Sequence, residues 1–322
     1  MRRPASRRPM AVALLAPIAV TVAVAGCGGS TSTSTSSANP PVKVTGAAGQ
    51  APTVSIPATK PGTALVTKTL TAGSGPVLAP TDSILANFAL YDWRDKTHKL
   101  LLSSYQSTPQ TLPLKIGLSG LQTSLSSARV GARLLAVLPP KYGYGAQGNS
   151  QLGVQPTDTL VFVIDVLKAF TATQSATGTH VTDGGGSLPK VTAQLGTSPQ
   201  IAIPKTVPPS KLVVKTLIKG SGTPIKAGQV LVVRYVASIW RTGKVFNDDW
   251  PTLAQPTAPP NVFQLGKLIP AWNTGLVGVP VGSRVMLVVP PAEGYGKHGQ
   301  PTAGIKGTDT LVFVVDILST AT

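Results

Sequence analysis

The residue types that most often do covalent or acid–base chemistry are sparse in this sequence. The chain of 322 residues has 3 histidines, 1 cysteine and 11 acidic residues. His98, His180 and His298 lie far apart, so they do not have the spacing of metal ligands. The adjacent acids Asp248 and Asp249 are typical of a solvated turn. We therefore expect no metal, no cofactor and no acid–base or covalent catalysis.

The single cysteine, Cys27, stands where lipid attachment requires a thiol. Arginines precede an apolar run from Met10 to Ala25, which is typical of a secretory leader and too short for a comfortable membrane span. The run ends in Val24-Ala25-Gly26-Cys27, which resembles the bacterial lipobox. We predict a leader and lipobox at 1–27, lipidation of Cys27, and an extracytoplasmic protein anchored by lipid to the cell membrane of a bacterium.

Two glycine-rich segments, at 143–148 and 294–299, have the spacing of a dinucleotide-binding fingerprint. That fingerprint requires a strand before the glycines and a helix that begins at them. Prolines precede each segment, and further prolines and glycines follow, so neither requirement is met. The net charge of +17 does not indicate nucleic-acid binding either, because the lysines and arginines form no stripe interleaved with aromatic residues.

Aromatic side chains are the remaining group that could build a site. In the second half of the chain they are Tyr235, Phe246, Phe263, Trp272, Tyr295 and Phe313. Such residues fill ordinary cores as often as they line pockets. Whether these residues fill a core or line a pocket depends on the strands and helix that carry them.

Those elements belong to a unit that occurs twice. Leu65 begins a segment that is repeated from Leu212, and the T-L-V-F strand around Phe162 is repeated around Phe313. Low-complexity stretches rich in Ser, Thr, Pro and Gly precede each copy. We predict a disordered tether at 28–61, a first domain at 62–170, a flexible linker at 171–209 and a second domain at 210–322.

Runs of Val, Ile, Leu and aromatic residues bounded by Gly or Pro predict strands in both copies. They are Ser83 to Trp93, Arg133 to Leu138 and Thr159 to Leu167 in the first copy, and Val230 to Trp240, Arg284 to Val289 and Thr310 to Leu318 in the second. Pro270 suits the first turn of a short helix up to Leu276. The fold class is therefore α+β, with a curved antiparallel sheet packed on one short helix in each domain.

The order of motifs in the second copy resembles the FKBP family of peptidyl-prolyl isomerases. The resemblance covers about Lys211 to Leu318. It is carried by I-P-A-W up to Trp272, by V-G-S-R up to Arg284, and by V-P-P-A-E-G-Y-G, which contains Tyr295.

The resemblance implies a role for each residue of a proline-binding site. Trp272 would form the floor, with Tyr235, Phe246 and Phe313 as walls. The Tyr295 hydroxyl would donate a hydrogen bond to a substrate carbonyl, as would the Ile269 N–H. The predicted catalytic residues are Tyr235, Phe246, Asn247, Trp272, Tyr295 and Phe313, and the predicted substrate-binding residues are Phe263, Leu268, Ile269 and Ile305.

Both copies depart from the family. Asn247 stands where the family has an aspartate, with Asp248 next to it, and Asn261 replaces an aromatic residue before Phe263. The first copy departs further. It has Leu121 in place of Trp272 and Phe88 in place of Tyr235, with Leu101 and Leu102 expected at the places of Phe246 and Asn247, while Tyr144 and Phe162 persist.

We predict a monomeric enzyme that isomerises X–Pro bonds in exported client proteins, with activity in the second domain and a binding or structural role for the first. It would bind proline-containing clients and, through its lipid, the membrane, but no nucleic acid. Two alternatives remain open. One is an envelope chaperone or adaptor that binds clients without catalysis. The other is a wall-binding protein held by its positive charge.

Overall fold

The computed structural model describes residues 41–181, 186–194 and 196–321. Cys27, the predicted leader at 1–27 and the first part of the predicted tether lie outside these residues. Within the described ranges, no helix has the length and apolar character needed to cross a membrane.

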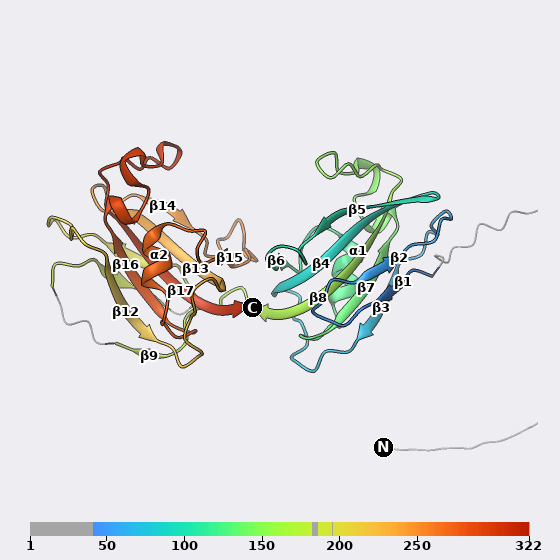
Figure 1. The fold of residues 1–322 in the computed structure, drawn as a ribbon, viewed down its shortest axis with the longest axis horizontal. Coiled ribbons are helices and arrows are strands. Elements are labelled where there is room, and N and C mark those ends of the chain that lie inside the picture. Colours follow the sequence, from blue (N-terminus) through green and yellow to red (C-terminus); the bar gives the residue numbers. More distant parts are fainter. Residues whose placement is uncertain (1–40, 182–185, 195, 322) are drawn as a thin grey trace, which may run out of the picture. The chain divides into compact units, whose positions relative to one another are not determined.

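The first domain is a six-stranded antiparallel sheet with one short helix (Figure 1). The strand order is β3-β7-β8-β4-β5, and β6 also pairs with β4. The bounds are β3 Val66–Thr71, β4 Ser83–Arg94, β5 Thr97–Ser103, β6 Gln110–Pro113, β7 Arg133–Leu138 and β8 Thr159–Phe170, with α1 at Ser119–Leu125 and the 3₁₀ turns η1 Pro140–Tyr142 and η2 Gly145–Gln147.

The second domain repeats this arrangement and adds a strand from the preceding linker. Its order is β14-β13-β17-β16-β12-β9, and β15 also pairs with β13. The bounds are β9 Thr179–His180, β12 Val213–Lys219, β13 Val230–Ile239, β14 Val245–Asp248, β15 Asn261–Gln264, β16 Arg284–Val289 and β17 Leu311–Ala321, with α2 at Pro270–Gly275 and the 3₁₀ turns η3 Pro291–Glu293, η4 Gly296–His298 and η5 Pro301–Ala303. The α+β fold predicted from the sequence is confirmed.

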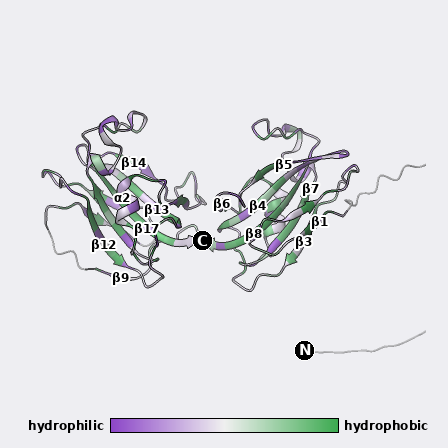
Figure 2. Ribbon diagram, in the orientation of Figure 1, coloured by the Kyte–Doolittle hydropathy of each residue, from purple (hydrophilic) through white to green (hydrophobic). Residues whose placement is uncertain are grey.

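The central strands are buried on both faces, and most of their length has the hydrophobic colour in Figure 2. Alternate residues of a strand point to opposite faces. In β16, Val285 and Leu287 pack towards α2, whereas Met286 and Val288 belong to a separate cluster on the other face. All four are fully buried. Each sheet therefore needs a cover on its outer face as well as a helix on its inner face.

A β-hairpin that precedes each domain supplies this outer cover. β1 (Lys43–Thr45) and β2 (Thr53–Ser55) pair before the first domain, and β10 (Lys190–Thr192) and β11 (Gln200–Ala202) pair before the second. Val44, Val54 and Ile56 join the outer cluster of the first domain. Leu188, Val191, Ile201 and Ile203 join that of the second.

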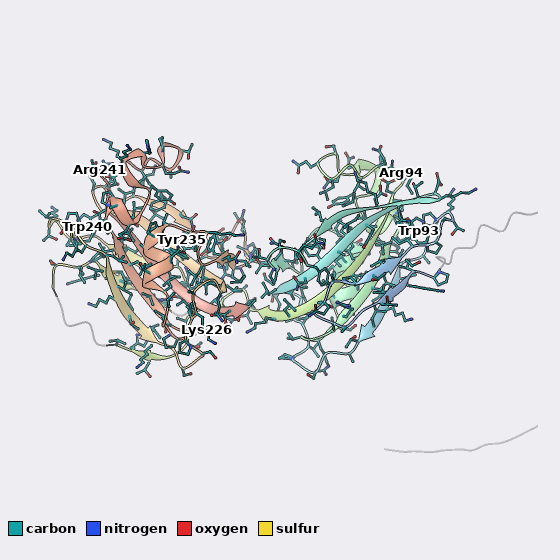
Figure 3. All side chains as sticks on the ribbon, in the orientation of Figure 1. Trp93, Arg94, Lys226, Tyr235, Trp240 and Arg241 are labelled. Atoms are coloured by element: carbon teal, nitrogen blue, oxygen red, sulfur yellow. The ribbon has the colours of Figure 1, made fainter. Side chains whose placement is uncertain are left out.

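A tryptophan on the outer face of each sheet is tied to the strap of chain that follows its hairpin. Trp93 Nε1 donates to Thr59 O at 2.9 Å, and Trp240 Nε1 donates to Thr206 O at 3.0 Å. Both indole rings are buried, and each is followed by an arginine paired with a buried aspartate (Figure 3). The repeated unit is thus longer than the motifs of the two domains alone indicate.

These hairpins lie in segments that the sequence predicted as a tether at 28–61 and a flexible linker at 171–209. The described residues of these segments include the strands β1 and β2 in the first and β9, β10 and β11 in the second. The composition did not reveal the hairpin strands because each is only 3 residues long and has one large apolar side chain, at its centre. Such strands are stable only when a partner surface covers that side chain.

The hairpin contacts predict a stability effect far from any cavity. Replacing Ile201 by Ala removes apolar contacts from the outer cluster, so the free energy of unfolding of the second domain should fall by about 1–2 kcal/mol. Chemical denaturation followed by tryptophan fluorescence measures this change. Replacement of the exposed neighbour Lys190 by Ala is the control and should change the value by less than about 0.5 kcal/mol. Equal effects of the two changes would contradict the role assigned to the hairpin.

Candidate active site

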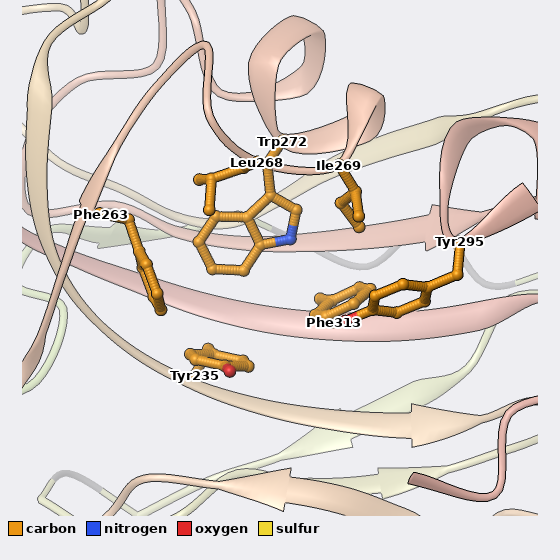
Figure 4. Close-up of a pocket in the computed structure, with 7 residues that line it drawn as sticks. All are labelled: Tyr235, Phe263, Leu268, Ile269, Trp272, Tyr295 and Phe313. Carbon is orange, nitrogen blue, oxygen red and sulfur yellow. The ribbon is translucent and has the colours of Figure 1, made fainter. Parts of the chain in front are cut away.

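A small aromatic cavity opens on the inner face of the second domain (Figure 4). Its volume is about 130 Å³, below the ~300–1,000 Å³ of pockets that enclose drug-sized ligands. It therefore suits one small apolar group. The residues that line it are Tyr235, Phe263, Leu268, Ile269, Trp272, Tyr295 and Phe313.

The start of α2 places the floor of this cavity. Ile269 is the N-cap residue with an extended backbone, and Pro270 occupies the first helical position, where its missing N–H costs nothing. Trp272 then falls on the buried side of the helix and is 4% exposed. Because Ile269 precedes the helix, its N–H has no intrahelical acceptor and is available to a ligand.

Asn273, which the reasoning from sequence did not select, holds the rim turn against α2. Gly266 N donates to Asn273 Oδ1 at 2.7 Å, and Asn273 Nδ2 donates to Leu268 O at 3.0 Å. Gly266 has a φ of 97°, a conformation that favours glycine. Asn273 therefore fixes the backbone that presents Leu268 and Ile269 to the cavity.

The aromatic rings pack edge to face around the floor. Tyr235 lies 5.3 Å from Trp272 between ring centroids at 85°, and 6.0 Å from Phe263 at 62°. Trp272 is also 5.6 Å from Phe263 and 5.8 Å from Phe313, at angles near perpendicular. These geometries are the favoured ones for aromatic pairs. The ring set is therefore held by mutual contacts and presents apolar surfaces to the cavity.

The other three predicted site residues lie near the cavity but do not line it. Phe246 packs edge to face on Phe313 at 5.9 Å, behind the wall. Ile305 is 3% exposed and belongs to the surrounding core. Asn247 lies opposite Ala237 in the β13–β14 ladder and is half-buried. The roles that the resemblance implied for these residues stay predictions.

Two tyrosine hydroxyls face the cavity region, and both stay protonated at neutral pH. Burial, followed by the nearby Asp249 carboxylate and Tyr295, raises the pKa of Tyr235 to about 12. Burial also raises the pKa of Tyr295, which is 38% exposed and extends over the cavity in Figure 4. Within the described part of the chain, no acceptor engages the Tyr295 hydroxyl, so it can donate to a bound carbonyl.

Asp249 was wrongly expected to be a solvated turn residue. Asp248 is exposed and accepts from Ser198 Oγ at 2.7 Å, so that expectation holds for it alone. Asp249 instead turns inward and accepts the Tyr235 N–H at 2.7 Å. Burial raises the pKa of Asp249 to about 7. The only sequence signal was its closeness to Phe246, which did not distinguish it from Asp248.

The corresponding region of the first domain has fewer aromatic rings, because Leu121 stands at the place of Trp272. In the β4–β5 ladder the irregularity skips Leu101, as it skips Phe246 in β13–β14, so the predicted equivalence of Leu101 with Phe246 and of Leu102 with Asn247 is confirmed. Leu121 is fully buried in the first core. The residues around it in the same cluster include Phe88, Leu101, Leu112, Tyr144 and Phe162.

Metal chemistry finds no support in the described ranges, where no group of three or more His, Cys, Asp or Glu side chains has a geometry that could hold an ion. The cavity itself carries no carboxylate or imidazole in its lining. Its physical properties are an apolar aromatic surface and two hydrogen-bond donors at the rim. Such a site can bind a small apolar ring and orient a carbonyl beside it.

Known proteins resemble both domains. The family model described as FKBP-type peptidyl-prolyl cis-trans isomerase matches residues 79–167 and 222–318, more than half of the chain. An FK506-binding protein of Streptomyces anulatus is 33% identical over 123 residues, covering 38% of this chain and 95% of that protein. A probable FK506-binding protein of Corynebacterium glutamicum is 34% identical, covering 38% and 97%.

A third relative is longer than the match. The FKBP-type peptidyl-prolyl cis-trans isomerase FkpA of Escherichia coli is 36% identical over 107 residues, covering 33% of this chain and 37% of that protein. Its crystal structure aligns with a TM-score of 0.30 and 34% identity, covering 34% of this chain and 47% of the other.

The raised pKa of Tyr235 predicts that this residue adds no tyrosinate absorbance in an alkaline titration of the native protein up to pH 11. Between pH 9 and 11 the native Tyr235→Phe variant should lose no tyrosinate absorbance relative to wild type, because the hydroxyl ionises only near 12. In denaturant the same substitution should remove one step with a midpoint of about 10. The neutral hydroxyl stabilises the fold below pH 10, and this stabilisation is lost as pH rises through 12. A step in tyrosinate absorbance near pH 10 that is present in native wild type and absent in native Tyr235→Phe would contradict the buried environment of this hydroxyl.

Proposed function

Because this chain belongs to the family of FKBP-type peptidyl-prolyl cis-trans isomerases, we propose that its second domain isomerises X–Pro bonds in exported proteins. The observation that carries this proposal is the closed set of aromatic rings around the cavity over Trp272. The first domain has the same scaffold but carries Leu121 and Leu101 in place of Trp272 and Phe246.

The properties of the cavity suit the reaction. Rotation about an X–Pro bond faces a barrier of about 18–20 kcal/mol, because the planar amide is stabilised by resonance. The twisted transition state has lost that resonance and is less polar. A prolyl ring seated on Trp272 places the amide in apolar surroundings, which disfavour the planar state more than the twisted one. A barrier lower by about 4 kcal/mol would accelerate the reaction roughly a thousandfold.

Two donors at the rim would orient the substrate. The Tyr295 hydroxyl is protonated at neutral pH, and the Ile269 N–H belongs to the residue that precedes the first turn of α2. Each would donate to a peptide carbonyl on one side of the prolyl ring. Holding the two flanks of one bond favours rotation about that bond over tumbling of the whole segment. No proton is transferred and no covalent bond forms, so the site needs neither a base nor a cofactor.

The first domain would bind clients without catalysing their isomerisation. Leu121 offers an apolar floor, and Tyr144 retains a hydroxyl at the position of Tyr295. Phe88 lacks the hydroxyl of Tyr235, and leucines replace the rings of Trp272 and Phe246. Exported clients are proposed because of the leader and Cys27, whose lipid would hold both domains at the outer surface of the cell membrane.

Replacing Trp272 by Leu should show whether the activity of the chain resides in the second domain. In the full chain, the variant should lower kcat/KM for a prolyl peptide by about tenfold or more, because the leucine removes the flat floor on which the prolyl ring packs. Acceleration of cis–trans relaxation by the full chain measures this. Trp240→Phe is the matched control, since Trp240 lies on the outer face of the same sheet. A wild-type chain without activity would refute the enzyme proposal and leave a chaperone that only binds.

The proposed anchor has a separate test. Cys27→Ala should move the protein from the membrane fraction to the soluble fraction of cells that express it, because the thiol that carries the diacylglycerol is gone. Ser30→Ala, in the same segment but outside the lipobox, should leave the protein in the membrane fraction. Retention of the Cys27→Ala variant at the membrane in high salt would refute the anchor.

A further inference from the structure

Strand β13 leaves a gap in its ladder at the residue that forms one wall of the cavity. On one side, β15 pairs with Val230 to Val233, and β14 pairs with Val236 to Ser238. Arg234 and Tyr235 lie between these stretches. The backbone of Tyr235 therefore has no strand partner on that side, although β17 pairs with it on the other.

Asp249 fills this gap with both its backbone and its side chain. Its N–H donates to Tyr235 O at 3.3 Å, and its Oδ1 accepts from Tyr235 N at 2.7 Å. The other carboxylate oxygen, Oδ2, accepts from Asn261 Nδ2 at 2.5 Å. Asn261 begins β15, which carries Phe263 two residues later. One carboxylate thus joins the strands that supply Tyr235 and Phe263.

The first domain has the same gap and closes it without a charge. There, β6 pairs with Ser83 to Ala86 and β5 pairs from Ala89 onward, so Phe88 is left between them. Ser104 N donates to Phe88 O at 3.0 Å, and Phe88 N donates to Ser104 Oγ at 2.9 Å. Ser104 is therefore the counterpart of Asp249. A hydroxyl suffices to satisfy the backbone at this position.

Few charged groups face the Asp249 carboxylate. Arg234 on β13 is fully buried and donates from Nη1 to the Asp249 carbonyl, while Asp248 on β14 adds a like charge. From β15 only the neutral Asn261 contacts it, and β17 contributes Asp316, which faces Arg234. Burial raises the pKa of Asp249 to about 7, against the two hydrogen bonds and the Arg234 charge, which lower it.

The ionised carboxylate therefore lowers the stability of the fold. A pKa raised above its unfolded value means that this group stabilises the folded state fully only below about pH 4, and that this stabilisation is lost as pH rises through about 7. Yet only in the ionised form are both oxygens of Asp249 free of a proton, so that one can accept from Tyr235 and the other from Asn261. A group that costs stability where serine would suffice is typical of a functional site.

We propose that Asp249 is a positioning residue for the cavity: its carboxylate ties Tyr235 to the strand that carries Phe263, and so sets the two walls against Trp272. The inference rests on the proposed isomerase function of the second domain. Asp249 does not touch the substrate. It acts through Tyr235, whose ring contacts Phe263, Trp272 and Phe313.

The experiment compares the full chain with Asp249→Ser, which installs the residue of the first domain, with Asp249→Asn, and with Asp248→Asn as the matched control. The first readout is kcat/KM for a prolyl peptide between pH 5.5 and 8.5. The second is the amide NMR shift of Tyr235 over the same range, which does not depend on activity. Thermal unfolding at pH 5.5 and 8.5 shows that each variant is folded.

Wild type and Asp248→Asn should gain activity with a midpoint near pH 7, as Asp249 ionises. Asp249→Ser should show about tenfold lower kcat/KM at pH 8, the loss expected for one hydrogen bond to a charged group, and no step near 7. The Tyr235 amide shift should titrate near pH 7 in wild type and in Asp248→Asn, which both contain Asp249. It should not titrate there in Asp249→Ser or Asp249→Asn. The stability of Asp249→Asn relative to wild type should rise between pH 5.5 and 8.5.

Two results overturn the inference. One is wild-type kcat/KM and an unchanged pH profile in Asp249→Ser. The other is a Tyr235 amide shift that does not follow the ionisation of Asp249. A wild-type chain that is inactive at every pH overturns the proposed function instead, and the amide titration then decides whether Asp249 positions Tyr235.

Discussion

The central strands of each sheet are apolar on both faces, and this property determines what must pack on each side of the sheet. In β17, Phe313 and Val315 face the cavity side while Val312 and Val314 face the outer cluster, and all are buried. A sheet of this kind is stable only between two covers. The helix and the aromatic rings form the inner cover, and the hairpin forms the outer one. The site therefore depends on a segment that lies outside the family match at 222–318.

A buried ion pair on the outer face makes the same segments necessary for a second reason. Arg133 pairs with Asp165 through two contacts at 2.6 Å, and Arg284 pairs with Asp316 at 2.5 and 2.7 Å. A buried pair needs further hydrogen bonds to offset the loss of hydration. The chain before each domain supplies them.

The two copies use different parts of that chain for this purpose. In the first domain, the hairpin loop meets the pair through the carbonyls of Gly46 and Gln50 and the N–H of Gly49. In the second, the N–H of Ala176 donates to Asp316 at 2.7 Å. The charges thus help to specify where the preceding segment docks, while the apolar side chains of the hairpin pack against the outer cluster.

The sequence was sufficient for the three central strands of each domain and for α2 because their signals are local. A continuous run such as 284–289 shows its own burial, and Pro270 marks the start of α2. The hairpins escaped prediction because Val191 and Ile201 acquire meaning only through a surface formed elsewhere in the chain. Asp249 escaped for a related reason. Its role follows from a gap between β14 and β15, and no property of adjacent aspartates reveals which of them meets that gap.

Comparison of the two copies separates what the scaffold requires from what the cavity requires. Both copies keep the outer tryptophan and the buried ion pair, which tie each sheet to the chain around it. Both also keep the gap in the ladder. At the ladder gap, the copy with Leu121 in place of Trp272 has the neutral Ser104, and the copy with the aromatic cavity has the half-buried Asp249. The costlier group occurs where four aromatic rings must keep fixed angles. This pairing is expected if the carboxylate serves the geometry of the cavity, because the backbone alone is satisfied equally well by serine.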